Sequence, residues 1–218
     1  MDRSSRNRLT DRQLDRFPGE TLFDRIARAV CHAGCLPRKE LFEAWEVARR
    51  VRRRFRGGRV VDLACGHGLL ASLLLLLDDS SPCALGIDRA LPESAVKLQV
   101  VLAASWPRLA GRVALHGGEI DAVALTADDL VVSVHACGGL TDRVIDLAIA
   151  ARARLAVLPC CHDLEQNTGG ELRGWLDGPL AMDVARATWL QAAGYRVVTQ
   201  SIPAEITPKN RLLLAEPG

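Results

Sequence analysis

A small-residue turn inside an apolar run constrains the fold of this chain more than any other feature. The run "VVDLACGHGLLASLLLLL" extends from Val60 to Leu77, and the turn Gly66-His67-Gly68 interrupts it. β-Branched residues before the turn favour a strand, and leucines and alanines after it favour a helix. A strand that feeds a helix through such a turn leaves the first N–H groups of the helix unpaired and aimed at whatever binds there. The turn therefore predicts a ligand site.

Strand and helix patterns alternate along the rest of the chain. This alternation predicts an α/β domain over residues 58–218, with a mostly parallel sheet and helices on both faces. The expected strands are 59–65, 83–88, 112–116, 129–136, 154–160, 195–202 and 210–216, and the expected helices are 68–77, 91–104, 140–151 and 179–193. Because no helix separates the last two strands, one of the seven is expected to be antiparallel.

The first 57 residues are expected to form a basic helical extension. Residues 1–19 are polar, and we expect a mobile arm there. Thr21 and Asp24 form a variant capping box at the start of one helix. A second helix is expected from Pro37, at its first position, to about Phe55. Its apolar stripe consists of Leu41, Trp45, Ala48, Val51 and Phe55, and arginines cover much of the remaining surface.

The net charge of +2 hides an asymmetry. Residues 1–59 carry 16 Lys+Arg and 8 Asp+Glu, whereas the remainder carries 12 and 18. A basic extension on an acidic body favours a polyanionic partner, and arginine suits phosphate through its bidentate fork. The alternative is a solvated helix face. The residues expected to contact an RNA substrate are Arg50, Arg53, Arg54, Lys209 and Asn210.

Composition predicts a cytoplasmic globular protein. The seven cysteines are an odd number without framework spacing, which indicates free thiols in a reducing compartment. The apolar stretch from Gly68 to Leu77 is too short to span a bilayer, and we expect neither a transmembrane segment nor a signal peptide. No metal site is expected, because the adjacent Cys160, Cys161 and His162 would point to opposite faces of an extended backbone.

The residues around the turn favour one cofactor over another. "GHGLLA" satisfies G-x-G-x-x-A, and Asp88 ends a strand about 20 residues after Gly68. Asp62 adds a carboxylate close to the glycines, which would repel a pyrophosphate but attract a sulfonium and an α-amino group. S-adenosylmethionine offers both cations, and its ribose diol suits Asp88. We therefore expect S-adenosylmethionine rather than NAD, the alternative being a tight turn without a ligand.

Several segments resemble a known superfamily. "VVDLACGHG" and "ALGIDRA" resemble the first two motifs of class I S-adenosylmethionine-dependent methyltransferases. The pairing of H-x-C-G with P-C-C-H, in "SVHACGGLTDRVIDLAIAARARLAVLPCCHDL", is similar to a group that includes the acceptor-stem tRNA ribose 2′-O-methyltransferases and the glutathione S-transferase C-terminal-domain-containing proteins. "ITPKNRLLLAE" is similar to the C-terminal strand of bacterial members. The resemblance covers about residues 59–216 and implies a Rossmann-like fold and an enzyme of class EC 2.1.1.-.

The resemblance also implies roles for individual residues. Asp88 would hold the ribose, and Glu119 falls where adenine is contacted, with Asp121 equally close. Gly138 falls beside the transferable methyl group, as does the loop 159–162. The implied cofactor residues are Asp62, Ala64, Gly66, Gly68, Asp88, Arg89, Glu119, His135 and Cys137.

Two chemistries are open for methyl transfer. His135 or His162 would act as a general base toward a hydroxyl or amine. Cys160 or Cys161 would instead add to a pyrimidine ring as a thiolate, in a layout that resembles the RNA 5-methylcytosine enzymes; otherwise these cysteines are small buried hydrophobes. We expect methylation of tRNA or rRNA, with ribose 2′-O favoured over cytosine C5. The alternatives are a small-molecule or protein methyltransferase of the same fold, and a non-catalytic nucleic-acid-binding module.

Overall fold

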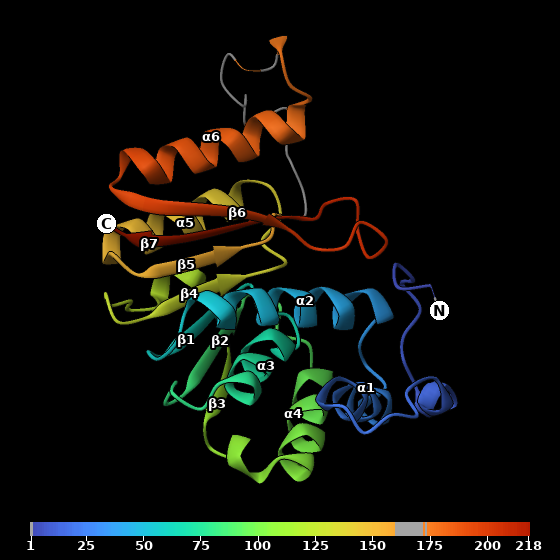
Figure 1. Cartoon of the computed structure of the whole chain (residues 1–218). Helices are drawn as coiled ribbons and strands as arrows, with labels where there is room; N and C mark the ends of the chain where they lie inside the picture. The colour runs from blue at the N-terminus through green and yellow to red at the C-terminus, as the bar shows by residue number, and fades with distance from the viewer. Residues whose placement is uncertain (1, 160–171, 173) are drawn as a thin grey trace.

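The computed structural model describes residues 2–159, 172 and 174–218. Within these residues, seven strands form one sheet in the order β3-β2-β1-β4-β5-β7-β6 (Figure 1). The strands are β1 (Val60–Leu63), β2 (Ala84–Asp88), β3 (Val113–Gly117), β4 (Leu130–Ser133), β5 (Arg154–Val157), β6 (Tyr195–Ser201) and β7 (Arg211–Pro217). The first five are parallel, and β7 runs antiparallel to both β5 and β6. The predicted α/β Rossmann-like sheet with one antiparallel strand is therefore confirmed.

Helices cover both faces of the sheet, as the alternating pattern predicts. They are α1 (Leu22–Ala33), α2 (Arg38–Arg54), α3 (Leu69–Leu77), α4 (Ser94–Ser105), α5 (Gly139–Ala151) and α6 (Gly178–Ala192), with short 3₁₀ segments η1 (Asp11–Arg16), η2 (Pro107–Leu109) and η3 (Ile120–Ala122). None of the helices in the described part of the chain is long and apolar enough to cross a membrane.

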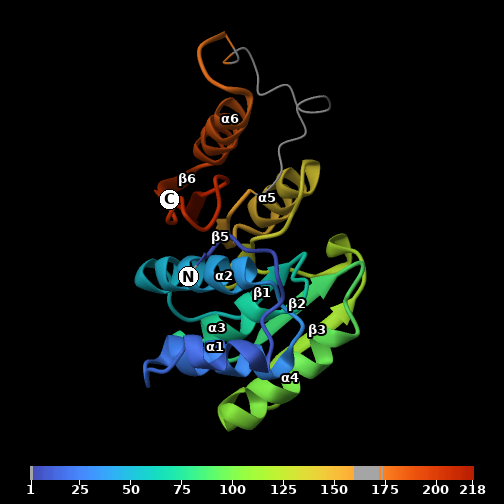
Figure 2. The ribbon, with the colours of Figure 1, turned by 90° about the vertical axis from the view of Figure 1, so that its right-hand side faces the viewer.

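Alternate side chains of each strand enter different cores. Val60 packs with α1 to α4, whereas its neighbour Val61 packs with α5 and α6. Leu130 and Val131 on β4 divide in the same way, because successive strand residues point to opposite faces. Figure 2 shows α1 and α4 at the bottom of the molecule and α6 at the top. The first core includes residues from both 1–57 and 58–218.

The prediction of a mobile arm over residues 1–19 is wrong. Leu9 and Phe17 are only 0% and 2% exposed, and η1 forms between them. The backbone N–H groups of Arg38 and Lys39 donate to the carbonyls of Asn7 and Ser5, each over 3.0 Å. The physical reason lies in the start of α2, where the N-cap Pro37 makes no side-chain cap hydrogen bond. Backbone carbonyls of the N-terminal segment accept the hydrogen bonds of those first N–H groups instead.

Other local predictions about the N-terminal helices hold, with one shift. The Thr21 side chain accepts a hydrogen bond from the backbone N–H of Asp24 over 3.1 Å, which caps α1 as the sequence predicts. Pro37 is the N-cap of α2 rather than its first helical residue. Along α2, Leu41, Ala48, Val51 and Phe55 of the expected stripe are buried.

The carboxyl ends of β1, β2, β4 and β5 meet at one edge of the sheet, which we call the rim. The start of β7 belongs to the rim too, because Val157 near the end of β5 pairs with Leu213. Helix α2 runs the opposite way. It begins at the rim and ends at the other edge, where Arg154 at the start of β5 donates to the carbonyl of Arg56 over 2.6 Å. In Figure 1 the start of α2 and the β6–β7 loop both lie on the right.

Candidate functional site

The turn after β1 has the left-handed backbone that its glycines predict. Gly66 and Gly68 have φ values of 53° and 70°, and Ala64 also has a positive φ of 58°. A Cβ on Gly68 would stand 2.5 Å from a Leu115 side-chain atom, so glycine is required there for packing on β3. A Cβ on Gly66 would meet nothing within 4 Å among the described residues. The turn thus leaves open space above Gly66, where a ligand can approach the backbone closely.

Asp88 is fixed beside this turn by two backbone groups. Its Oδ2 accepts from the N–H of Gly66 and its Oδ1 accepts from the N–H of Ala90, each over 2.9 Å. The carboxylate is half-buried at the end of β2. Because each carboxylate oxygen has more than one acceptor site, the group can still accept from a ribose diol.

Asp62 is the most deeply buried acid at the turn. Only 2% of the residue is exposed, and it accepts a hydrogen bond from the N–H of Ala71 over 3.3 Å. Burial raises the pKa of this carboxyl group to about 8, the charge of Asp88 adds to the rise, and the Ala71 hydrogen bond opposes it. A cation bound nearby would offset the cost of ionising Asp62. This chemistry fits the positively charged methionine end of S-adenosylmethionine.

The loop after β4 carries the H-x-C-G motif. Because β4 ends at Ser133, earlier than expected, His135 and Cys137 lie in this loop. Burial lowers the pKa of His135 to about 4, and the charges of Lys39 and His67 lower it further while Asp88 opposes them. The imidazole is therefore neutral at neutral pH and keeps one ring nitrogen as a hydrogen-bond acceptor. Cys137 is exposed.

A pocket joins the turn, the β4 loop and the start of α2. Its lining residues are Leu36, Glu40, Ala44, Asp62, Ala64, Cys65, His67, Leu69, Leu70, Val134 and His135. The sequence prediction found Asp62, Ala64 and His135 but missed Glu40. The available signal was helical spacing, because Glu40 lies one turn before the buried Ala44.

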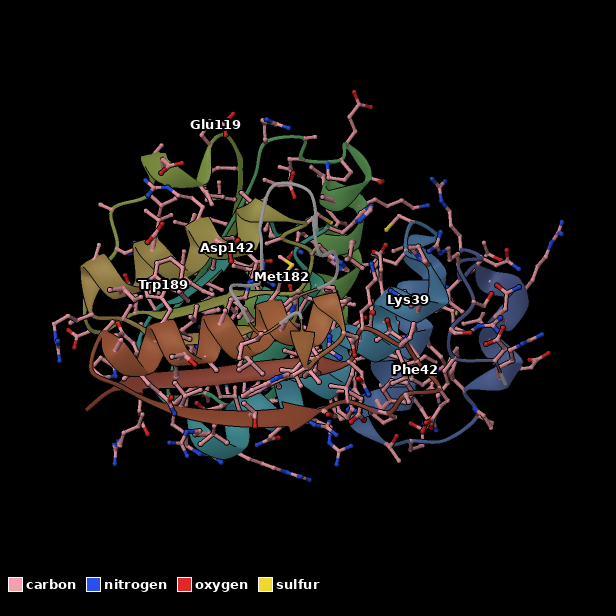
Figure 3. The ribbon with its side chains drawn as sticks, turned by 90° about the horizontal axis from the view of Figure 1, so that it is seen from above. Lys39, Phe42, Glu119, Asp142, Met182 and Trp189 are labelled. Atoms are coloured by element: carbon pink, nitrogen blue, oxygen red, sulfur yellow. The ribbon has the colours of Figure 1, made fainter. Side chains whose placement is uncertain are left out.

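The remaining predicted cofactor residues lie on loops at the rim. Arg89 follows β2 and is exposed. Glu119 follows β3 and is also exposed, and Figure 3 shows it at the outside of the molecule. The N–H of Gly118 donates to the carbonyl of Asp88 over 3.1 Å, so the two loops are tied together. The alternative acid, Asp121, forms an ion pair with Arg143 of α5.

The structure does not bring the arginines of α2 to the rim. Arg50, Arg53 and Arg54 lie in the half of the helix that leads to the opposite edge. Arg50 forms an ion pair with Glu46 one turn earlier, and Arg54 pairs with Glu216 on β7. The predicted substrate residues are thus divided between two edges of the sheet.

Lys209 and Asn210 do lie at the rim, on the β6–β7 loop. Asn210 donates from Nδ2 to the carbonyl of Ile202 over 2.9 Å, which closes the base of this loop. Lys209 is exposed beside it.

Three predicted catalytic residues, Cys160, Cys161 and His162, lie outside the described residues. Cys31, Cys35, Cys65 and Cys83 are free thiols. Within the described ranges, no group of three or more His, Cys, Asp and Glu side chains is placed to hold a metal ion.

Comparisons with known proteins agree with this geometry. A family model described as "Methyltransferase domain" matches residues 40–167. A glutathione S-transferase C-terminal domain-containing protein of Xenopus laevis is 54% identical over 37 residues, which are 17% of this chain and 6% of that protein.

Solved methyltransferase structures share the fold. A tRNA (m1A22) methyltransferase of B. subtilis matches with a TM-score of 0.53 and 16% identity, over 81% of this chain and 65% of that one. An O-methyltransferase family protein of Burkholderia thailandensis matches with a TM-score of 0.56 and 20% identity, over 94% and 63%. The chain therefore spans just under two thirds of these structures, and likeness at such identities establishes the fold alone.

The family match covers the turn, both acids beside it and the H-x-C-G loop. The chain therefore belongs to the methyltransferase-domain family and has a Rossmann-like fold, with the residues that would hold S-adenosylmethionine gathered at the turn.

Proposed function

We propose that this methyltransferase acts on RNA and holds the RNA backbone at the rim. The observation that carries the proposal is a set of exposed arginines on the N-terminal segment: Arg3, Arg6 and Arg8. This segment is hydrogen-bonded to the start of α2, and Arg8 forms a β-bridge with Pro37. Guanidinium groups bind phosphate bidentately without reading sequence, so they would position an RNA over the pocket.

Electrostatic contacts support this placement. Burial lowers the pKa of His67 in the turn, and the positive charge of Arg8 lowers it further. Arg3 forms an ion pair of 3.1 Å with Glu205 on the β6–β7 loop, which also carries Lys209. Arg8 therefore lies near the pocket, whereas Arg3 ties the N-terminal segment to the β6–β7 loop and stacks over the Phe42 ring at 5.2 Å, outside the pocket lining.

An exposed aromatic side chain offers a second kind of contact. Trp175 is 90% exposed just before α6. The first half of α6 lies toward the rim, because Asp183 pairs with Arg211 at the start of β7 over 2.7 Å. Aromatic rings on such a surface stack on unpaired bases, which favours a single-stranded or looped RNA target.

The residues at the pocket support methylation of a ribose 2′-hydroxyl. S-adenosylmethionine supplies the methyl group when bound. Asp88 and the turn would hold its ribose, and Asp62 would face its cationic end. His135 is neutral at neutral pH, so a free ring nitrogen can accept a hydrogen bond from a hydroxyl nucleophile, although its lowered pKa makes it a weaker base than an ordinary histidine. Thiolate attack by Cys160 or Cys161 on cytosine C5 is the alternative chemistry.

A second candidate is methylation of a small molecule. Some structural neighbours whose names refer to the biosynthesis of small molecules cover more of this chain than the tRNA enzymes do. The pyocyanin biosynthetic protein PhzM covers 96% of the chain with a TM-score of 0.53, against 81% for the B. subtilis tRNA enzyme. The exposed arginines at the rim favour RNA over this candidate.

Mass spectrometry of nucleosides tests the proposal. The purified protein is incubated with S-adenosylmethionine and RNA from cells that lack it, and a new 2′-O-methylated nucleoside is expected. At saturating S-adenosylmethionine, His135→Ala should lower the rate by about 10²- to 10⁴-fold. His116→Ala, an exposed histidine on β3, is the matched control and should keep the wild-type rate.

Two outcomes would contradict parts of this proposal. A denaturant-resistant adduct with 5-fluorocytosine-containing RNA, lost in Cys160→Ser or Cys161→Ser, would establish C5 methylation. Methyl transfer to small molecules with none to any RNA would favour the second candidate.

A further inference from the structure

One wall of the pocket at the turn comes from the start of α2. Leu36, Glu40 and Ala44 form this wall, while Asp62 and His135 face the pocket from the sheet side. Glu40 and Ala44 are one helical turn apart and therefore share a face of α2. The N-terminal region thus supplies a carboxylate to a pocket whose other walls come from the methyltransferase motifs.

Glu40 has no counter-ion of its own. Burial raises the pKa of its carboxyl group, and the charge of Glu43 raises it further while Lys39 lowers it. Lys39 is engaged with Glu43 in an ion pair of 2.7 Å. Within the described part of the chain, Glu40 has neither a hydrogen-bond nor an ion-pair partner. A half-buried acid in this state gains from a cation that enters the pocket.

The strand order indicates which part of the cofactor reaches this pocket. Asp88 ends β2, the turn follows β1, and His135 follows β4, and these strands are neighbours in the order β2-β1-β4. A ligand with its ribose at Asp88 that crosses the turn toward β4 has its methionine end in the pocket. That end carries an α-ammonium group, the cation that Glu40 lacks.

We infer that Glu40 of α2 binds the α-ammonium group of S-adenosylmethionine. The inference concerns the methyl donor alone and does not depend on the RNA substrate. It makes the N-terminal helix part of the cofactor site, whereas the first motif recognised in the sequence begins at β1; the family match itself begins at residue 40.

Two ligands that differ only at the methionine end test this inference. S-adenosylhomocysteine keeps the ammonium group, whereas 5′-methylthioadenosine has the same adenosine and thioether without the amino-acid part. Calorimetry with Glu40→Gln should show about 10- to 100-fold weaker binding of S-adenosylhomocysteine, the range for a charge-assisted hydrogen bond. Binding of 5′-methylthioadenosine should change less than about twofold.

Two further variants control for effects on the helix itself. Glu46→Gln removes a carboxylate of α2 that pairs with Arg50 away from the pocket, and both ligands should bind it as they bind the wild type. Glu40→Asp keeps the charge with a shorter reach, so it should show an intermediate loss for S-adenosylhomocysteine only. This variant also keeps the test valid if Glu40→Gln does not fold.

Three results would overturn the inference. Equal losses for both ligands would mean that Glu40 acts on the adenosine end or through the fold. Unchanged binding of S-adenosylhomocysteine would place Glu40 away from the ammonium group. Failure of the wild-type protein to bind either ligand would show that the pocket is not a cofactor site. This result is distinct from a failure to methylate RNA.

Discussion

At the scale of single residues, burial decides what each acid at the turn can do. Asp62 and Asp88 were predicted from motif spacing, and both lie beside the glycines. Motif spacing could not predict the raised pKa of Asp62, because burial under α3 causes it. Glu40 escaped prediction because its place in the pocket depends on how α2 lies over the turn. The sequence signal for this packing is a carboxylate that precedes a buried alanine by one helical turn.

Asp62 should make the stability of the ligand-free protein fall as pH rises. The unfolded carboxyl group has a pKa of 3.8, and burial raises the folded value to about 8. Between these values the folded state keeps a proton that the unfolded state releases, so the free energy of unfolding decreases with increasing pH. Denaturant unfolding at pH 5, 6.5 and 8 measures this. In Asp62→Asn the decrease should be smaller, and an identical pH dependence in both proteins would contradict the raised pKa.

At the scale of elements, α2 connects the two edges of the sheet and has different surroundings at each. Its first turns face the pocket, whereas Arg52 near its end is 3% exposed and donates from Nε to the carbonyl of Leu74 over 2.9 Å. The arginine run from Arg49 to Arg59 therefore includes a buried structural residue. The sequence predicted the helix and its apolar stripe, but its direction relative to the strands depends on tertiary packing, so the edge reached by the arginines could not be predicted.

Two triple variants test which arginines contact RNA. Replacing Arg3, Arg6 and Arg8 by Gln should weaken RNA binding and flatten its salt dependence by about 0.7–0.9 for each lost phosphate contact. The matched triple variant replaces the α2 residues Arg50, Arg53 and Arg54, at the other edge, and should change the salt slope less. Filter binding over a series of salt concentrations measures both slopes. A larger change of the salt slope in the α2 variant would support the sequence-based hypothesis that this helix binds the RNA.

At the scale of the whole molecule, the alternation of strands and helices was sufficient to predict the sheet and both helical layers. Apolar periodicity carries that information, because each strand and helix must bury one face. Strand ends were less well predicted, since β4 stops at Ser133, where the chain leaves the sheet for the H-x-C-G loop. The prediction of a mobile N-terminal arm is wrong because the composition of the segment is polar as a whole, whereas its position depends on two apolar side chains, Leu9 and Phe17. The boundary between residues 57 and 58 stays a prediction.

Leu9 should anchor the N-terminal arm to the first core. The side chain is 0% exposed, and the backbone N–H of Leu9 donates to the carbonyl of Leu36 over 2.9 Å. Leu9→Ala should therefore cost about 2–5 kcal/mol of the free energy of unfolding, through lost burial and the cavity left behind. For a chain of this size that cost lowers the melting temperature by about 4–20 °C. Arg12→Ala, an exposed change in η1, should leave the melting temperature near that of the wild type. If Leu9→Ala melts at the wild-type temperature, the arm does not belong to the core, and its arginines would have no fixed position over the rim.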